Sequence, residues 1–156
     1  MVKQATTPRP PILLVEDTLS LQMVYRSILT GAGHRVSVAG SAADALAQFR
    51  ALRPQLVMMD LVLPDRDGLA LMQELQAIHA ETTVIAITAN GSVNRAVEAM
   101  RAGAHDFLVK PVDETRLLDA VRNARAARRL RAVAPALAPP DPDLEREALT
   151  DTAGFI

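Results

Sequence analysis

The segment that most constrains the fold is a short apolar run, from Leu56 to Met59, which ends on Asp60. A loop containing Pro64 and Gly68 follows it. A short apolar run bounded by polar and turn residues is typical of a strand buried on both faces of a parallel sheet. In open α/β sheets, ligands bind at the carboxyl ends of the strands. Because folding does not require an acid at this point, the pattern predicts a chemical role for Asp60.

The rest of the chain alternates between segments that favour strands and segments in which apolar residues keep helical spacing. The predicted strands are 12–15, 35–39, 56–59, 84–87 and 105–109, and the predicted helices are 18–31, 41–52, 69–78, 92–102 and 113–131. Because strands alternate with helices throughout, we expect a parallel sheet with right-handed crossovers. This is a doubly wound, flavodoxin-like α/β domain, whose five strands would lie in the order 2-1-3-4-5.

Cap residues and apolar spacing predict local detail in the helices. Thr18, Ser41 and Ser92 are predicted N-caps, because a hydroxyl can accept a free N–H group of the first helical turn. Val24 and Ile78 occupy positions that helical spacing assigns to buried faces.

The distribution of prolines marks the expected limits of the folded domain. The chain has 156 residues and ten prolines, most of which lie outside residues 12–131. We therefore predict a flexible leader over 1–11, one domain over 12–131, and a semi-rigid linker rich in alanine and proline over 132–156.

Composition excludes several classes of function. The net charge of −1 and the sequence pI near 6.3 give no reason to expect contact with nucleic acid or an anionic membrane. The chain has no cysteine, which excludes disulfides and thiolate metal sites. Since no signal peptide or membrane-spanning run is present in the sequence, we expect a cytoplasmic protein.

Polar residues follow four of the predicted strands, and they would meet at one edge of the sheet. These residues are Glu16 and Asp17, Asp60, Thr88 and Lys110. Three carboxylates close together repel one another unless a cation lies among them, and hard oxygen ligands suit Mg²⁺. Thr88 and Lys110 add a hydroxyl and a positive charge, which could stabilise a phosphoryl group. The set predicts that Asp60 is a nucleophile that forms an aspartyl-phosphate.

The sequence resembles the receiver domain of two-component response regulators, a CheY-like domain, over roughly residues 11–131. The matching motifs are Glu16-Asp17, Asp60 with Pro64 and Asp67-Gly68, Thr88-Ala89, and Lys110-Pro111. The resemblance implies that Asp60 accepts a phosphoryl group from phosphohistidine on a sensor histidine kinase or a phosphotransfer protein. It implies no enzyme activity other than the chain's own phosphorylation and dephosphorylation.

The same resemblance implies a Mg²⁺ site. Asp17 and Asp60 would ligate the ion together with the backbone carbonyl of Val62, and Glu16 would act through a water molecule.

Further residues acquire roles by this resemblance. Thr88 and Lys110 would bind phosphoryl oxygens. Thr88 and Phe107 would form the switch, in which Phe107 turns inward when Thr88 moves toward the phosphoryl group. Receivers often carry tyrosine at this position, so any hydrogen bond made by its hydroxyl is lost here. The bond between Lys110 and Pro111 would be cis.

A closer resemblance is to LuxO-like members of the NtrC family of sigma-54-dependent transcriptional activators. The residues that carry it are Val15-Glu-Asp-Thr18 with Tyr25-Arg-Ser27, and 96–100 with 104–111. In that family a linker leads from the receiver to an AAA+ ATPase domain, often entered through Gly-Phe-Ile-Gly. Since this chain stops at Gly154-Phe-Ile156, we expect the regulatory part of a longer transcription factor.

Phosphorylation would change the surface formed by the fourth predicted helix, the fifth strand and the fifth helix, residues 92–109 and 113–131. That surface would control self-association or a downstream ATPase. The last helix is rich in arginine, which is typical of a solvated face. The alternative is that this helix forms part of a homodimer.

Three other functions remain open at the level of sequence. The first is a relay receiver, alone or in a hybrid kinase, without transcriptional output. The second is a phosphatase of the haloacid-dehalogenase type, which would need a general acid where this chain has Val62. The third is a flavodoxin-like binding module, whose phosphate loop should not begin with the acidic pair Glu16-Asp17.

Overall fold

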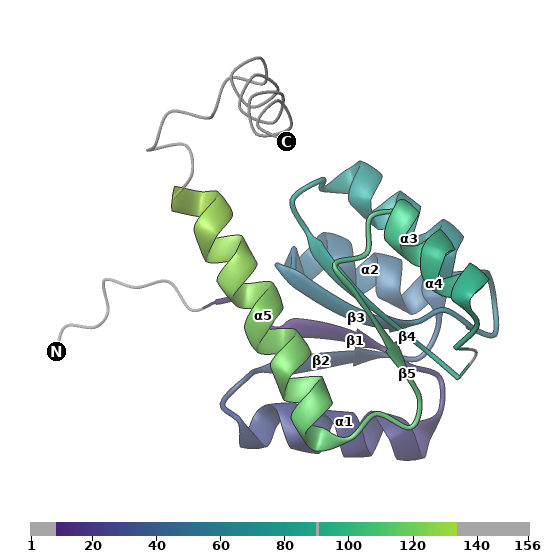
Figure 1. The fold of residues 1–156 in the computed structure, drawn as a ribbon, viewed down its shortest axis with the longest axis horizontal. Helices are drawn as coiled ribbons and strands as arrows, with labels where there is room; N and C mark the ends of the chain where they lie inside the picture. Colours follow the sequence, from purple (N-terminus) through teal and green to yellow (C-terminus); the bar gives the residue numbers. More distant parts are fainter. Residues whose placement is uncertain (1–8, 90, 134–156) are drawn as a thin grey trace, which may run out of the picture. The chain divides into compact units, whose positions relative to one another are not determined.

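The computed structural model describes residues 9–89 and 91–133, and the side chains among them up to residue 130. Five parallel strands form one sheet in the order β2-β1-β3-β4-β5 (Figure 1). The strands are β1 Ile12–Val15, β2 Val36–Ala39, β3 Leu56–Asp60, β4 Thr83–Thr88 and β5 Asp106–Val109. The helices are α1 Leu19–Gly31, α2 Ala42–Leu52, α3 Gly68–Ile78, α4 Val93–Arg101 and α5 Glu114–Val133. The predicted fold and strand order are confirmed.

The chain divides into two compact units, and the boundary lies within α5 after Arg125. The first unit contains the whole sheet. Helix α5 runs two residues beyond its predicted end, to Val133. The predicted leader over 1–11 and linker over 132–156 fall almost entirely outside the described residues. None of the helices within the described ranges is long and apolar enough to cross a membrane.

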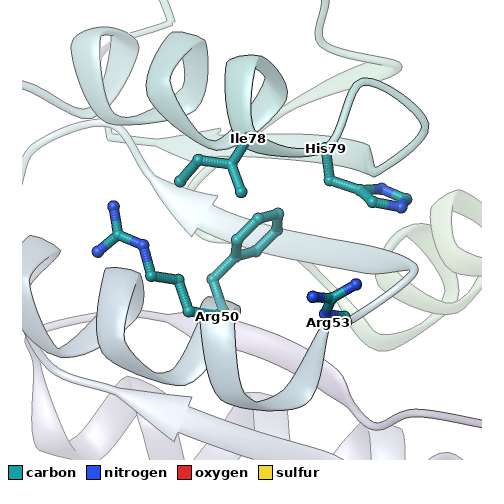
Figure 2. Close-up of a pocket in the computed structure, with 5 residues that line it drawn as sticks. Arg50, Arg53, Ile78 and His79 are labelled. Atoms are coloured by element: carbon teal, nitrogen blue, oxygen red, sulfur yellow. The ribbon is translucent and has the colours of Figure 1, made fainter.

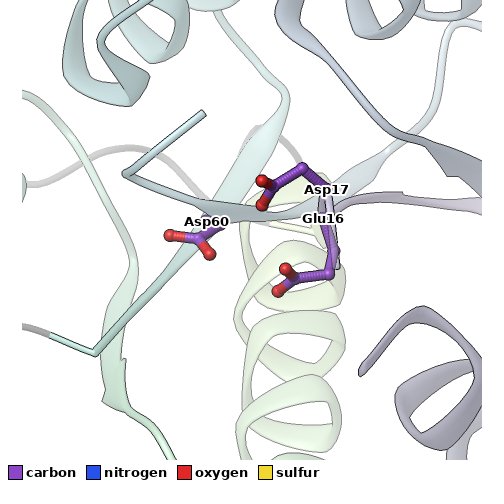
Figure 3. Close-up of side chains that lie close together, drawn as sticks. All are labelled: Glu16, Asp17 and Asp60. Carbon is purple, nitrogen blue, oxygen red and sulfur yellow. The ribbon is translucent and has the colours of Figure 1, made fainter. Parts of the chain in front are cut away.

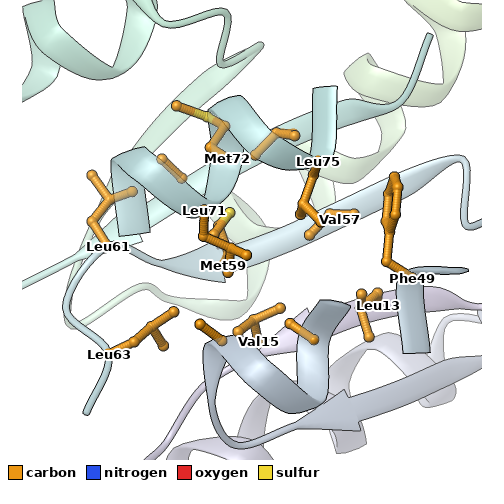
Figure 4. Close-up of a cluster of buried hydrophobic side chains, with 14 of the residues drawn as sticks. Leu13, Val15, Phe49, Val57, Met59, Leu61, Leu63, Leu71, Met72 and Leu75 are labelled. Carbon is orange, nitrogen blue, oxygen red and sulfur yellow. The ribbon is translucent and has the colours of Figure 1, made fainter. Parts of the chain in front are cut away.

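The sheet is buried on both faces because its central strands are apolar at successive positions. Alternate strand residues, such as Leu13 and Val57, face a core made with α2 and α3, to which Phe49 and Leu75 contribute (Figure 4). Every residue of β1, β3 and β4 is buried. This pattern explains why the runs contain no alternation of polar residues.

The other strand residues face α1 and the first part of α5. Ile12, Met58 and Ile85 pack there with Leu29 of α1 and Val121 of α5. The edge strand β2 is only half-buried over most of its length. The alternating pattern of residues 35–39 therefore predicted an edge strand correctly.

The predicted caps are confirmed in two helices and wrong in one. The hydroxyl of Ser41 accepts the Asp44 N–H at 3.1 Å, and that of Ser92 accepts the Arg95 N–H at 3.1 Å. Thr18 occupies the N-cap position of α1 but makes no capping bond with its side chain. Its own N–H instead donates to the Glu16 carboxylate at 3.0 Å, so the acid that precedes the helix orders the turn.

Two residues expected in the core lie at the surface. Val24 is 50% exposed and Ile78 is 42% exposed, whereas the adjacent Tyr25 is buried. Helical spacing alone did not distinguish Val24 from Tyr25, and the larger ring covers more apolar surface when it is buried. Ile78 is the last residue of α3, where the helix has already passed the edge of the core.

Candidate functional site

The strand register brings the predicted polar residues to the carboxyl edge of the sheet. Asp60 pairs with Ile87, and Thr88 pairs with Val109. Lys110 directly follows Val109, and its N–H donates to the Thr88 carbonyl at 2.9 Å. Residues far apart in sequence therefore converge because four parallel strands end together.

Glu16, Asp17 and Asp60 form an acidic cluster at this edge (Figure 3). Each side chain offers one oxygen, and these oxygens lie within 4.8 Å of one another. Glu16 is 1% exposed and Asp60 is 5% exposed, whereas Asp17 faces solvent. A group of carboxylate oxygens open on one side fits Mg²⁺, which retains water molecules in its coordination sphere.

Lys110 lies between two members of the acidic cluster. Its Nζ is 2.5 Å from Asp60 Oδ2 and 2.8 Å from Glu16 Oε1. Burial would lower the pKa of Lys110, but hydrogen bonds and charges from Asp60 and Glu16 outweigh burial and hold this pKa above its usual value. One ammonium cannot balance three ionised carboxylates, so the cluster still favours a divalent cation.

The loop after Asp60 is closed tightly by Gly68. The Val62 N–H donates to Asp60 Oδ1 at 2.8 Å, and the Gly68 N–H donates to the Leu61 carbonyl at 2.9 Å. A Cβ on Gly68 would lie 2.4 Å from Leu61 Cα, a separation that no side chain tolerates. Val62 also forms an isolated backbone bridge with Asp67, which fixes the course of the loop.

The remaining predicted residues lie beside the cluster. Thr88 is fully buried at the end of β4, and Phe107 in β5 is half-buried against the core. The peptide bond between Lys110 and Pro111 is cis, the isomer that the resemblance implied. Their roles in phosphoryl binding and switching stay predictions.

Sequence reasoning gave Tyr25 no role in the site, although its hydroxyl lies in the field of the acidic cluster. The ring is buried, and the hydroxyl has no hydrogen-bond partner within the described part of the chain. Burial raises the pKa of Tyr25; the Lys110 charge opposes this rise, and the Glu16 and Asp60 charges add to it. The only available signal was that Tyr25 is the single tyrosine of the chain.

Two contacts that fasten the loop after Asp60 were also missed. Asp65 accepts the N–H groups of Ala42 and Ala43, at 2.8 and 2.9 Å, at the start of α2. Asp67 accepts a hydrogen bond from the Arg95 guanidinium of α4 at 3.0 Å. These partners lie 22 to 28 residues apart, so local sequence patterns could not reveal them.

Known proteins are similar to this chain in sequence. Residues 12–122 match the family described as response regulator receiver domain. The chain is 40% identical over 111 residues to the luminescence regulatory protein LuxO of Vibrio campbellii, covering 71% of this chain and 24% of the relative. It is 39% identical over 115 residues to the transcriptional regulatory protein ZraR of Salmonella typhimurium, covering 74% of this chain and 26% of the relative.

Solved structures agree with the sequence comparisons. The receiver domain of NtrX from Brucella abortus has 36% identity and a TM-score of 0.70, covering 72% of this chain and 96% of the other. A CheY-like receiver from Methanospirillum hungatei has 25% identity and a TM-score of 0.75, covering 80% of this chain and 99% of the other. The chain spans about a quarter of the length of the curated relatives it matches.

These matches confirm the resemblance that was drawn from the strand-end motifs, including its LuxO-like character. The residues that match the family, 12–122, lie within the region predicted as one domain. The chain belongs to the receiver domain family of two-component response regulators.

Proposed function

We propose that this receiver is a phosphorylation-dependent switch in which Asp60 accepts the phosphoryl group of a phosphohistidine. The observation that carries the proposal is the position of Asp60, whose carboxylate is paired with Lys110 beside two other acids. A carboxylate oxygen of Asp60 would form the new P–O bond as the P–N bond of phosphohistidine breaks. The donor would be a sensor histidine kinase or a phosphotransfer protein.

The acidic cluster supports a Mg²⁺ site in this reaction. Asp17 and Asp60 would ligate the ion with the backbone carbonyl of Val62, and Glu16 would act through water. When bound, the ion would offset the negative charge of the arriving phosphoryl oxygens. The bond from the Val62 N–H to Asp60 Oδ1 supports this arrangement, because it holds the loop against the acceptor carboxylate.

Lys110 and Thr88 would bind the phosphoryl oxygens after transfer. Lys110 already donates to Asp60, so its ammonium needs only to exchange one anionic oxygen for another. Thr88 lies at the end of β4, the strand next to that of Asp60, and its hydroxyl would donate to a second phosphoryl oxygen. Both residues would act by electrostatic stabilisation, and neither needs to gain or lose a proton. The chain would thus catalyse only its own phosphorylation and dephosphorylation.

Movement of Thr88 toward the phosphoryl group would allow Phe107 to turn inward and change the surface of α4, β5 and α5. Apolar side chains are already exposed on part of that surface: Val93, Val97 and Met100 of α4 and Val109 of β5. Exposed apolar groups gathered on two adjacent elements are typical of an interaction surface. The proposed result is a change in self-association through this surface or the C-terminal helix.

The output of the whole protein is proposed from its relatives. LuxO, ZraR and DctD are regulatory proteins, and the latter two are named as transcriptional regulators. We propose that the receiver controls an AAA+ domain of a sigma-54-dependent activator in the cytoplasm, with no direct nucleic-acid contact by the receiver. A relay receiver is the alternative, and whether the same gene encodes an AAA+ domain distinguishes the two. A haloacid-dehalogenase-type phosphatase is disfavoured because Val62 stands where its general acid would be.

Intact-mass spectrometry after incubation with acetyl phosphate tests the proposal. Wild type should gain one phosphoryl group in the presence of Mg²⁺ and none in the presence of a chelator. Asp60→Asn should gain none, because its amide is not a nucleophile. Labelling of this variant at another residue would overturn the assignment of Asp60 as the acceptor.

A further inference from the structure

A second concave site lies between the ends of α2 and α3 (Figure 2). It is at the opposite edge of the sheet from the acidic cluster. Its volume is about 320 Å³, and its lining residues are Phe49, Arg50, Arg53, Ile78 and His79. Arg53 and His79 follow α2 and α3 and precede β3 and β4, so the hollow faces the amino ends of these strands. Pockets that bind small molecules begin at about 300 Å³. The size suits a compound with one or two rings.

The hollow carries an excess of positive charge. Arg50 and Arg53 stand on the α2 side, and His79 stands on the α3 side (Figure 2). No ion pair within the described residues involves either arginine. The carbonyl ends of two helices contribute partial negative charges of about half a unit each. Two guanidinium groups exceed that charge, and each offers paired donors that match a carboxylate, sulfonate or phosphate.

The floor and one wall of the hollow are apolar. Phe49 is 2% exposed and forms part of the core, whereas Ile78 is 42% exposed beside it. Covering the exposed Ile78 side chain would remove apolar surface from water, which favours binding, and Phe49 would offer an apolar contact beneath it. A ligand that fits both features therefore needs an apolar body as well as a negative group.

The two walls are held in place before any ligand binds. Thr82 is buried, donates to the Pro54 carbonyl at 3.4 Å and contacts His79 Nδ1 at 3.2 Å. The N–H of Arg53 donates to the Phe49 carbonyl at 2.9 Å. Arg53 has φ 48°, a left-handed backbone that favours glycine. An arginine held in a conformation that costs stability is a reason to look for function at that position.

We propose that this hollow binds a small organic anion, in which a carboxylate, sulfonate or phosphate is carried on an aromatic or short aliphatic body. The arginines would hold the anion, and Phe49 and Ile78 would cover the body. This site does not depend on phosphorylation of Asp60, so the two proposals can fail separately.

The test is a titration of the ¹⁵N-labelled 156-residue chain with 1-naphthalenesulfonate, followed by NMR. This probe has an apolar body and a sulfonate that cannot transfer a phosphoryl group. Its saturable shifts should cluster on the backbone of residues 49–53 and 78–82. Neutral 1-naphthalenemethanol and inorganic sulfate should each bind at least about tenfold more weakly, because each lacks one of the two features that the hollow recognises.

Matched variants assign the binding to the arginines. Arg50→Gln and Arg53→Gln should each raise Kd by about threefold to tenfold, a discounted value for a partly solvated charged hydrogen bond. Arg101→Gln is the control. Arg101 is also an exposed arginine in the last turn of a helix, but that helix is α4 and lies outside the hollow. Arg53→Gly removes the charge and also relieves the left-handed strain. It should therefore lose binding while its thermal midpoint is at least that of wild type, which excludes unfolding as the cause.

Any of three results would overturn the proposal. The first is a set of shifts that maps to another surface, such as the exposed apolar residues of α1 or α4. The second is an unchanged Kd for both the Arg50→Gln and Arg53→Gln variants. The third is equal binding of the neutral compound. In those cases the arginines serve only to balance the helix ends.

Discussion

Lys110 carries the positive charge on which the electrostatic balance of the acidic cluster depends. The substitution Lys110→Met keeps most of the side-chain volume but removes the ammonium group from beside Glu16, Asp17 and Asp60. We expect the free energy of unfolding to fall by about 1–3 kcal/mol in the absence of metal, below the range for a fully buried pair because Lys110 is partly exposed. Denaturant unfolding measures this change.

Mg²⁺ should reverse much of that loss. With Lys110 removed, the carboxylates attract the ion more strongly, so added Mg²⁺ should raise the stability of the variant more than that of wild type. Denaturant unfolding without Ca²⁺ or Mg²⁺ provides the baseline for both proteins. An equal response of the two proteins to Mg²⁺ would contradict a shared site for Lys110 and the ion.

At Tyr25 we expect no loss of stability when the polar group is removed, because its buried hydroxyl has no hydrogen-bond partner within the described residues. Tyr25→Phe removes the unsatisfied group and keeps the ring, so stability should stay equal or rise by about 1 kcal/mol. Tyr25→Leu is the control, and it should lose stability because it leaves a cavity. A clear loss in Tyr25→Phe would instead indicate a hydrogen bond to the backbone of Val112, which, together with the larger effect of the Lys110 charge, lowers the pKa of this phenol against the effect of burial.

At the scale of elements, Asp65 joins the loop after Asp60 to the start of α2. Bonds from the Ala42 and Ala43 N–H groups lower the pKa of Asp65. A carboxyl whose pKa is lowered by folding stabilises the folded state above its unfolded pKa, and this contribution is lost as the pH falls through the folded value. Asp65→Ala should therefore unfold at a lower temperature than wild type above about pH 4.

The pH dependence separates this effect from a general loss of packing. The difference in thermal midpoint between wild type and Asp65→Ala should be constant from about pH 5 to pH 8 and shrink below about pH 4. Asp65→Asn should be intermediate at neutral pH, because its single carbonyl oxygen can accept only part of the helix-end bonding. A difference that persists undiminished in acid would show that the charge of Asp65 is irrelevant.

The same elements show what the sequence could and could not predict. Apolar runs in the sequence predicted β1, β3 and β4. Because a polar residue follows each run, Asp60 and its neighbours in the site could be predicted without knowledge of the tertiary contacts. Asp65 and Arg95 were missed because their roles arise from bonds to α2 and Asp67, which depend on how separate elements pack. Val24 was misplaced because helical spacing alone could not decide which of two adjacent apolar side chains would be buried.

At the scale of the whole receiver, the two edges of the sheet differ in chemistry. The carboxyl edge is acidic and suited to a cation, whereas the amino edge carries Arg50 and Arg53 around an apolar floor. The proposed organic anion at the amino edge and a phosphoryl group at the carboxyl edge could act on the same helices, since α2 and α3 reach both edges. Separate measurements of anion binding and phosphorylation would reveal such coupling, which by linkage must be equal in both directions.

The surface of α4 and β5 is where phosphorylation should become visible to a partner. Val93 is 77% exposed at the first position of α4, where an acid is compatible with the helix dipole. Val93→Glu should therefore fold normally but place a charge in any apolar interface. We expect wild type to self-associate more strongly after treatment with acetyl phosphate and Mg²⁺, and Val93→Glu to weaken that association by about tenfold or more.

Analytical ultracentrifugation at several protein concentrations measures this association before and after phosphorylation. Met23→Glu is the matched control, because Met23 is also a large exposed apolar residue but lies on α1. Mass spectrometry of the same samples establishes that both variants carry the phosphoryl group. Equal weakening by both substitutions would assign the association to general hydrophobic contact. Loss in Met23→Glu alone would move the interface to α1, and a response confined to Val93→Glu would locate it on α4 beside β5.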